Sequence, residues 1–408
     1  MNPVGQAGRR GDQVRSDCWI SVEVRESGGI AVALRSKVAS MYGDSIRATV
    51  ERGLAALGVK HAAVEVEDAG ALPFILAARL ETAVKRALPD VRAEFLPEAK
   101  PWATGATTRD RFRRSRLYLP GNEPKFMLNA GLHHPDGVIL DLEDSVAPPE
   151  KDAARAIVRN ALRVVDFCGC ERMVRINQVP AGLEDLDWIV PHNVHVVLIP
   201  KCESAEQVKA VDERVEKVRK DRDAKAPVLL MPIVESALGC VKAYEIAKAS
   251  PNVVALTIGL EDYTADLGTQ RTNEGRESFW ARSVVVNAAR AAGVQPIDTV
   301  FSDVADMDGL LASVLEAKAL GFDGKGCIHP RQIEVIHRGF TPSAAEIEKA
   351  KKIVVAFEDA GKKGLSVVSL GSKMIDPPVV KRAQRTVELA VAAGALAANW
   401  REGGGGNA

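Results

Sequence analysis

The sequence predicts an α/β protein: a TIM (β/α)8 barrel with a C-terminal helical extension, preceded by a small α/β domain. Three observations lead to this prediction. Eight apolar, strand-like runs recur between residues 116 and 330, helix-like stretches separate consecutive runs, and charged residues gather at the carboxyl ends of the runs. A doubly wound open sheet would give a similar order of elements, but it rarely needs eight strand–helix units.

The composition excludes several functional classes. Lys plus Arg and Asp plus Glu each number 54, so the formal net charge is zero, which argues against nucleic acid as the main partner. No segment approaches 18 uninterrupted apolar residues, so we expect no membrane span. The six cysteines do not stand at zinc-site spacing, and we expect reduced thiols in a cytoplasmic protein.

A small domain is expected over residues 16–90, after a disordered tail over 1–15 that has no apolar signal-peptide core. The runs Trp19–Val24 and Ile30–Leu34 flank Gly28–Gly29, which predicts a β-hairpin. A helix, a strand and a second helix are then predicted at Tyr42–Leu57, His61–Val66 and Ala77–Leu88. Residues 91–112 carry Pro, Gly and Thr without periodicity, so we expect a flexible linker.

The barrel is expected over residues 113–340, before a helical extension over 341–400 and a tail over 401–408. Its strand-like runs are RLYLPG (116–121), GVILDLED (137–144), RMVRIN (172–177), VHVVLIPK (194–201), PVLLMPIVES (227–236), VVALTIGLED (253–262), PIDTVFSD (296–303) and GKGCIHP (324–330). Helix-like stretches between them include Ala153–Leu162, Ala205–Arg219 and Arg282–Ala292.

Polar residues at the strand ends predict an active site, because the carboxyl ends of barrel strands line the catalytic face. Any one of them alone could simply cap the following helix. Together they place charge or imidazole at seven strand ends on one rim. These residues are Arg114–Arg116, Glu143, Asp144, Arg175, Lys201, Glu235, Glu261, Asp262 and His329.

The residue types at this rim suit a hard divalent cation. Glu235 and Asp262 follow adjacent strands, and no close Cys or His pair accompanies them, so two carboxylates favour Mg²⁺. Arg175 would face the same space, where its planar guanidinium can bind a carboxylate through two parallel hydrogen bonds. The rim therefore predicts an anionic, oxygen-rich substrate such as a 2-oxo acid.

Seven motifs, in order along the chain, resemble the β subunit of bacterial citrate lyase and its CitE-like relatives in the HpcH/HpaI aldolase superfamily. The resemblance covers about residues 113–385. The motifs are RRSRLYLPGNEPKF (113–126), DLEDSVAPPEKDAAR (141–155), VRIN (174–177), ESALG (235–239), GLEDYTADLGTQRT (259–272), CIHPRQIEVI (327–336) and GSKMIDPPVV (371–380).

The resemblance implies a Mg²⁺-dependent enzyme that cleaves a 3-hydroxyacyl thioester by a retro-Claisen step. By position, Glu235 and Asp262 match the metal ligands, and Arg175 matches the substrate-binding arginine. Arg114 matches a basic residue near the thioester and the CoA phosphates. Glu143 and Asp144 match acids that hold a metal-bound water. Asp376 matches a general acid/base that a C-terminal segment delivers to a neighbouring subunit.

The first domain resembles the γ subunit of citrate lyase, its acyl carrier protein, at SDCWISVEV (16–24), at IRATVERGLAALGV (46–59) and between Glu67 and Arg86. That family attaches a phosphoribosyl-dephospho-CoA arm to a serine. The matching position here holds Arg15, and Ser16 follows it. Either Ser16 carries the arm, or the domain is unmodified and the lyase uses free CoA thioesters.

The expected function is therefore cleavage of a citryl thioester, citryl-ACP or citryl-CoA, to oxaloacetate and an acetyl thioester. A citramalyl-CoA or malyl-CoA lyase and an aldolase acting on free 2-oxo acids remain alternatives within the superfamily. A catalytically silent carrier or scaffold subunit is an alternative of a different class. The resemblance also implies a homotrimer or hexamer with Asp376 acting in trans, and a citrate lyase α subunit as a partner.

Overall fold

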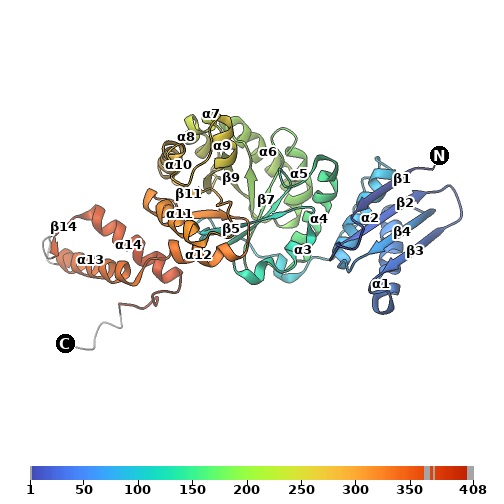
Figure 1. Ribbon diagram of the computed structural model, residues 1–408, viewed down its shortest axis with the longest axis horizontal. Helices are drawn as coiled ribbons and strands as arrows, with labels where there is room; N and C mark the ends of the chain where they lie inside the picture. Colours follow the sequence, from blue (N-terminus) through green and yellow to red (C-terminus); the bar gives the residue numbers. More distant parts are fainter. Residues whose placement is uncertain (1, 363–367, 371–372, 402–408) are drawn as a thin grey trace. The chain divides into compact units, whose positions relative to one another are not determined.

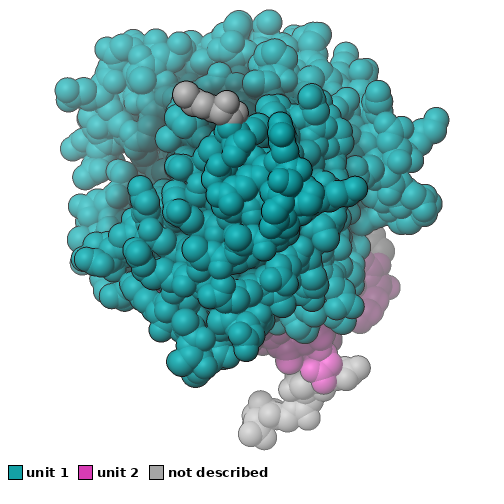
Figure 2. Space-filling model, turned by 90° about the vertical axis from the view of Figure 1, so that its right-hand side faces the viewer, with its two compact units in different colours: residues 1–333 teal, residues 334–408 magenta. Residues whose placement is uncertain are grey.

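The computed structural model describes residues 2–362, 368–370 and 373–401. Figure 2 shows the division of the chain into two compact units, Met1–Ile333 and Glu334–Ala408. The first unit holds the small α/β domain and the barrel, and the second holds the C-terminal extension (Figure 1). No helix among the described residues has the length and apolar character needed to cross a bilayer.

The small domain is a four-stranded sheet packed against two helices (Figure 1). Its core contains Ile20 from the sheet, Leu54 from the first helix and Leu80 from the second, all fully buried. Burial of such side chains stabilises the domain by roughly 1.5–3 kcal/mol each. Its elements are β1 (Val4–Gly8), β2 (Cys18–Val24), β3 (Ile30–Ser36), α1 (Ala39–Ala56), β4 (Ala62–Asp68) and α2 (Pro73–Ala87).

The expectation of a disordered tail over 1–15 is wrong for β1, which pairs antiparallel with β2. Helix α2 packs directly on this strand, which leaves room only for small residues. The sequence VGQAG therefore lacks the large apolar residues by which a strand is usually predicted. A Cβ atom on Gly5 would lie 2.0 Å from the carbonyl oxygen of Ala83. Small residues are therefore required here, and Ala7 is buried.

The predicted hairpin is also wrong. Strands β2 and β3 do not pair; β4 lies between them, antiparallel to β2 and parallel to β3. Gly28 and Gly29 both have positive φ, 99° and 74°, as expected for a turn, but the chain passes across the end of β4 instead of folding back directly. Glycines that favour a turn predict only that the chain changes direction. They cannot show that β4, from later in the sequence, will lie between β2 and β3.

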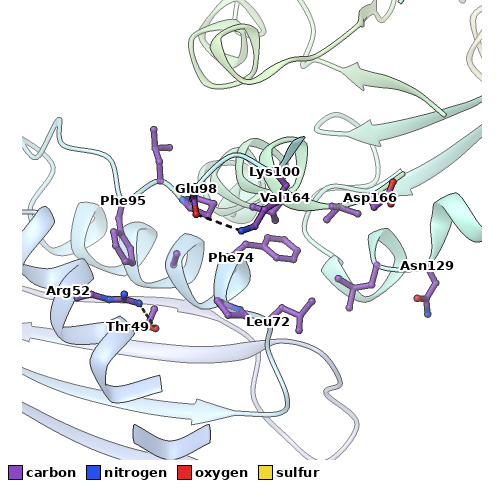
Figure 3. Close-up of a pocket in the computed structure, with 16 residues that line it drawn as sticks. Thr49, Arg52, Leu72, Phe74, Phe95, Glu98, Lys100, Asn129, Val164 and Asp166 are labelled. Carbon is purple, nitrogen blue, oxygen red and sulfur yellow. Dashed lines mark hydrogen bonds and ion pairs between the residues drawn. The ribbon is translucent and has the colours of Figure 1, made fainter. Parts of the chain in front are cut away.

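The segment between the small domain and the barrel packs on the barrel, so the expectation of a flexible linker is wrong. The backbone N–H of Lys100 donates to the carbonyl oxygen of Arg163 at 2.8 Å, and the Trp102 indole donates to that of Val164 at 3.0 Å. A cavity of about 900 Å³ remains between this segment, α1, α2 and the barrel, with Phe74, Phe95 and Val164 on its walls (Figure 3).

The predicted barrel is confirmed, since eight parallel strands close in the order β5-β6-β7-β8-β9-β10-β11-β12. Ile139, Met173, Leu198 and Met231 fill its interior. The strands are β5 (Ser115–Pro120), β6 (Gly137–Asp141), β7 (Glu171–Arg175), β8 (Val196–Ile199), β9 (Leu229–Val234), β10 (Ala255–Ile258), β11 (Gln295–Asp298) and β12 (Gly324–Cys327).

Helices surround the barrel strands, and each of the three predicted helix-like stretches is helical (Figure 1). The helices are α3 (Pro124–Met127), α4 (Lys151–Val164), α5 (Leu183–Ile189), α6 (Ala205–Asp221), α7 (Ala237–Val241), α8 (Ala243–Ala247), α9 (Leu260–Asp266), α10 (Phe279–Ala292) and α11 (Met307–Leu320). The next helix along the chain is α12 (Arg331–Phe340), within which the first unit ends and the second begins.

The C-terminal unit is helical as predicted, and a short two-stranded sheet joins its two long helices. These are α13 (Ala344–Lys362), β13 (Val368–Leu370), β14 (Lys373–Ile375) and α14 (Pro377–Ala392). Val354 of α13 and Val380 of α14 are buried in a shared apolar core.

Candidate active site

A cavity of about 480 Å³ opens at the carboxyl ends of the barrel strands. It combines acidic and basic side chains with an apolar wall, as expected for a site that binds a small polar ligand. Six of the residues predicted for the rim line it together: Arg116, Asp144, Arg175, Glu235, Glu261 and Asp262. Tyr118, Asp141, Ile233, Thr257, Gly259 and Ile328 also line it.

Strand β6 ends in a carboxylate that binds an arginine. Asp141 is 1% exposed, and its two oxygens accept hydrogen bonds from Nε and Nη2 of Arg175 at 2.7 and 2.8 Å. Burial raises the pKa of Asp141, but the bonds from Arg175 outweigh burial and hold that pKa below its usual value. The buried acid is therefore ionised, and one edge of the Arg175 guanidinium is fully used.

The rest of Arg175 is turned toward the other acids. Its Nη1 lies 2.9 Å from Glu143 Oε2 and 3.6 Å from an oxygen of Asp144. The ring of Tyr118 lies 5.3 Å from the guanidinium carbon, within cation–π distance. Because Asp141 occupies the Nε edge, only the opposite edge of Arg175 is left for a ligand carboxylate, and that ligand would share Nη1 with Glu143.

A lysine holds the remaining acids. The Lys201 ammonium lies 2.6 Å from Glu143 Oε1, 3.1 Å from both oxygens of Asp144 and 3.7 Å from Asp262 Oδ1. Burial raises the pKa of Glu143 even though Arg175 opposes the shift. The acids that end strand β6 are therefore balanced by two cations, which is how the fold tolerates them.

Glu235 is held at the end of β9 by a backbone donor. Its Oε2 accepts from the Lys201 N–H at 2.8 Å, and its side chain is almost fully buried. Burial, together with the nearby charges of Asp262 and Glu143, raises the pKa of Glu235 to about 7. Asp262 lies in the first turn of α9, half exposed. A buried carboxyl with a second acid beside it, at the carboxyl ends of barrel strands, is a candidate functional group.

Arg114 is not part of this cavity, so its predicted place beside the substrate is wrong. It precedes β5 and therefore lies at the opposite, amino-terminal end of the barrel. Its guanidinium forms two bonds of 2.9 Å with Asp136, which precedes β6. Arg116, two residues later, points into the barrel and does line the cavity. The two arginines are close in sequence but differ in position, because Arg114 lies before the start of β5 and Arg116 lies within the strand as it runs toward the cavity.

Ser16 belongs to the small domain, and Asp376 belongs to the second unit. Ser16 is half-buried, has φ 53° and donates its backbone N–H to Ala69 in the small domain. The neighbouring Asp17 binds Arg79, and Arg79 also donates to the carbonyl oxygen of Asn122 in the loop after β5. Asp376, in the second unit, caps the amino terminus of α14 by accepting from the Val379 N–H at 3.1 Å.

Sequence reasoning missed two of the residues that line the cavity, Asp141 and Gly259, and the full set of contacts made by the predicted rim residue Lys201. Asp141 was visible as the acid that ends an apolar run, but its arginine partner was not. Lys201 was known as a strand-end residue, whereas its contact with four acids arises only in space. Gly259 carries no signal, yet a Cβ there would lie 2.5 Å from Glu235 Oε1.

Comparison with known proteins agrees with this geometry. A family model for HpcH/HpaI aldolase/citrate lyase matches residues 114–330, and one for the malonate decarboxylase delta subunit matches residues 9–87. Citrate lyase subunit beta of Haemophilus influenzae is 41% identical over 284 residues, which cover 69% of this chain and 97% of that protein. Human mitochondrial citramalyl-CoA lyase is 35% identical and covers 68% of this chain and 85% of its own length.

A solved structure extends the likeness to three dimensions. CitE from Mycobacterium tuberculosis, in complex with magnesium, acetoacetate and coenzyme A, has a TM-score of 0.58 and 31% identity. The match covers 69% of this chain and 99% of that one. With its closed barrel, its cavity of converging acids and these likenesses, the chain belongs to the HpcH/HpaI aldolase/citrate lyase family.

Proposed function

We propose that this protein is a Mg²⁺-dependent carbon–carbon lyase that cleaves a citryl thioester to oxaloacetate and an acetyl thioester. The observation that carries the proposal is the convergence of Glu235, Asp262 and Arg175 on one cavity at the catalytic face of the barrel. The likeness to citrate lyase β subunits supports the choice of substrate.

The donor set fits a hard cation. Glu235 and Asp262 offer carboxylate oxygens, and burial, together with the charge of Asp262, raises the pKa of Glu235 to about 7. Within residues 2–362, 368–370 and 373–401, no group of three or more His, Cys, Asp or Glu is arranged to hold a metal. Two carboxylates completed by water and substrate are a common arrangement for Mg²⁺. When bound, Mg²⁺ would polarise the oxygens of the reacting group.

The side chains of the cavity then act on the substrate. Arg175 binds a substrate carboxylate with the edge of its guanidinium that Asp141 leaves open. Glu143 and Asp144, fixed by Lys201, hold a water beside the reacting oxygen. Cleavage needs a proton acceptor for the hydroxyl and an acid for the carbanion carbon of the acetyl thioester, and we assign that acid/base role to Asp376 of a neighbouring subunit.

This assignment requires an oligomer, a homotrimer or hexamer, in which one chain completes the site of the next. The N-cap bond of Asp376 engages one carboxylate oxygen in the described structure. A general acid that is also a helix cap is positioned at low entropic cost, which suits a residue delivered from another chain.

The small domain supports a thioester substrate. It resembles a carrier-type family model. Arg79 binds both Asp17 and the carbonyl oxygen of Asn122, and these contacts hold the Ser16 loop next to the loop that follows β5. Ser16 is the proposed attachment point of a phosphoribosyl-dephospho-CoA arm. A lyase that uses free CoA thioesters is the second candidate, favoured by Arg15 at the position that the carrier family's serine would occupy.

The test uses the full chain with Mg²⁺. Citryl-CoA, citramalyl-CoA, malyl-CoA and free citrate are each incubated with the enzyme, and the oxo-acid product is measured by coupled reduction with NADH. We expect oxaloacetate from citryl-CoA, none from free citrate, and loss of activity in Glu235→Gln and Asp262→Asn.

A result that contradicts this expectation would indicate one of the alternative functions. Faster turnover of citramalyl-CoA or malyl-CoA would identify the alternative lyases, and cleavage of free hydroxy-oxo acids alone would identify an aldolase. No turnover of any of these, with or without an added citrate lyase α subunit, would leave a carrier or scaffold role. Intact mass of the purified chain reports whether Ser16 carries an arm.

A further inference from the structure

One residue, Lys201, contacts four acids at the carboxyl ends of the barrel strands. Its backbone N–H donates to Glu235, and its ammonium contacts Glu143, Asp144 and Asp262. We propose that Lys201 is a positioning residue with two tasks: its backbone orients Glu235, and its ammonium is a resident counter-ion that competes with the divalent cation. This inference rests on the proposed function.

The backbone of Lys201 is held in an unusual conformation. Its φ is 46°, in the left-handed region that a residue with a Cβ atom rarely adopts. The residue lies just after β8, and this turn directs the N–H across to Glu235 Oε2 at 2.8 Å. A strained conformation that makes a specific bond to a buried carboxylate points to a functional demand at that position.

The ammonium lies where acids outnumber cations. Asp144, Glu235 and Asp262 line the cavity, Glu143 lies 2.6 Å from the ammonium, and Arg175 is already engaged by Asp141. Lys201 is only 28% exposed, so its attraction to these acids is partly sheltered from solvent. Without a divalent cation, the charge of Lys201 acts with that of Arg175 to limit the mutual repulsion of these acids.

A divalent cation held by Glu235 and Asp262 would compete with this ammonium for the Asp262 carboxylate, whose Oδ1 lies 3.7 Å from the ammonium. Lys201 would then retain Glu143 and Asp144, its closer partners. The ammonium and a divalent cation would compete for the same carboxylates, so Lys201 lowers the affinity of the site for the metal. When no metal is bound, Lys201 holds these carboxylates in position. Removing its charge should tighten metal binding.

The experiment measures binding of Mn²⁺ alone, without substrate, by the electron paramagnetic resonance signal of the free ion. Full-length wild type is compared with Lys201→Met, Lys201→Arg and the control Lys151→Met. Lys151 is a matched control because its ammonium bonds the main-chain oxygens of Leu142 and Glu143 at 2.7 and 2.6 Å.

We expect Lys201→Met to bind Mn²⁺ at least about tenfold more tightly than wild type, because one positive charge within a few ångströms of the ion is lost. Lys201→Arg should restore wild-type affinity, and Lys151→Met should change it by less than about threefold, since that charge faces main-chain oxygens.

Unchanged or weaker Mn²⁺ binding in a Lys201→Met protein that melts like wild type would overturn the proposal. Should that variant not fold, Lys201→Gln replaces it, and failure of both to fold would make the residue a structural support instead. Absence of Mn²⁺ binding in wild type would refute the proposed function itself, a result that is separate from any effect of Lys201.

Discussion

Glu81 in the small domain and Arg159 in the barrel form an ion pair in which both side chains are fully buried. The two guanidinium nitrogens of Arg159 lie 2.9 and 2.8 Å from the two oxygens of Glu81. Lys85 and the backbone N–H of Phe95 complete the coordination of the carboxylate. This pair joins α2 to α4 and makes the small domain a fixed part of the first unit.

Arg159→Met should therefore lower the free energy of unfolding by about 3–5 kcal/mol, because it leaves a buried carboxylate without its main partner. Chemical denaturation followed by circular dichroism measures the change. The double variant Glu81→Met/Arg159→Met should recover much of the loss. If the two single changes are additive in the double variant, the pair is not coupled.

Asp141→Asn should impair substrate binding, because it weakens the bidentate support of Arg175. We expect kcat/KM to fall about 10–100-fold, as is typical when a supporting partner of a binding residue is lost. Steady-state kinetics with citryl-CoA measures it. Asp152→Asn is the matched control, since Asp152 holds Arg86 with a similar pair of bonds at the domain junction. Equal loss in both variants would indicate general destabilisation.

Gly259→Ala should weaken metal binding without preventing folding. The added Cβ would lie 2.5 Å from Glu235 Oε1 and must displace that carboxylate. We expect Mn²⁺ affinity to fall about 10-fold or more, because metal sites tolerate little change in ligand position. Gly361→Ala in α13 is the control, as a Cβ there meets nothing within 4 Å. Unaltered affinity in Gly259→Ala would remove Glu235 from the ligand set.

Asp376→Asn and Asp376→Ala separate capping from catalysis. Asparagine still accepts the Val379 N–H, so Asp376→Asn keeps the cap of α14, whereas alanine loses it at a cost of about 1 kcal/mol. Both variants should lose about 10²–10⁴-fold in kcat because neither supplies a proton.

Mixing an Asp376→Asn chain with an Arg175→Ala chain should restore part of the activity, since some hybrid sites receive an intact residue from each. Activity that stays absent after the mixture has exchanged subunits would place Asp376 in its own chain or outside the reaction.

Stability should fall in acid because of His195. This side chain is buried, and its Nδ1 accepts from the Arg172 N–H while Nε2 lies 2.7 Å from the Gly105 carbonyl oxygen. Burial, and then the charge of Arg172, lowers the pKa of His195 from 6.5 to about 4. The unfolded chain therefore takes up a proton between these values and the folded chain does not, so stability is lost as pH falls through that window.

The loss attributable to His195 is up to about 3 kcal/mol between pH 7 and 4. Denaturation curves at pH 7, 6 and 5 should show that His195→Gln removes this part of the pH dependence, whereas the exposed His133→Gln does not. The same slope in wild type and His195→Gln would contradict the assignment.

The sequence by itself determined the architecture of the barrel. Each of the eight strand-like runs contains a strand, because parallel strands buried on both faces are mostly apolar. Lys325 in β12 is an exception, since it is fully buried and pairs with Asp298 at the end of β11. It also determined that Glu235, Asp262, Arg175 and Asp144 share one rim, since parallel strands of a barrel all end on the same side.

Tertiary structure decided the features that depend on residues far apart in the sequence, which a local sequence pattern cannot predict. The position of β4 between β2 and β3, the pairing of β1 under α2, and the packing of the linker each depend on contacts between distant residues. Arg114 was predicted at the active site because it lies two residues from Arg116. The start of β5 falls between them, so Arg114 stays at the amino-terminal end of the barrel and Arg116 points into its interior. The bonds from Lys201 to four acids arise only where the ends of β6, β8 and β9 meet the first turn of α9, because electrostatic partners are chosen by distance in space.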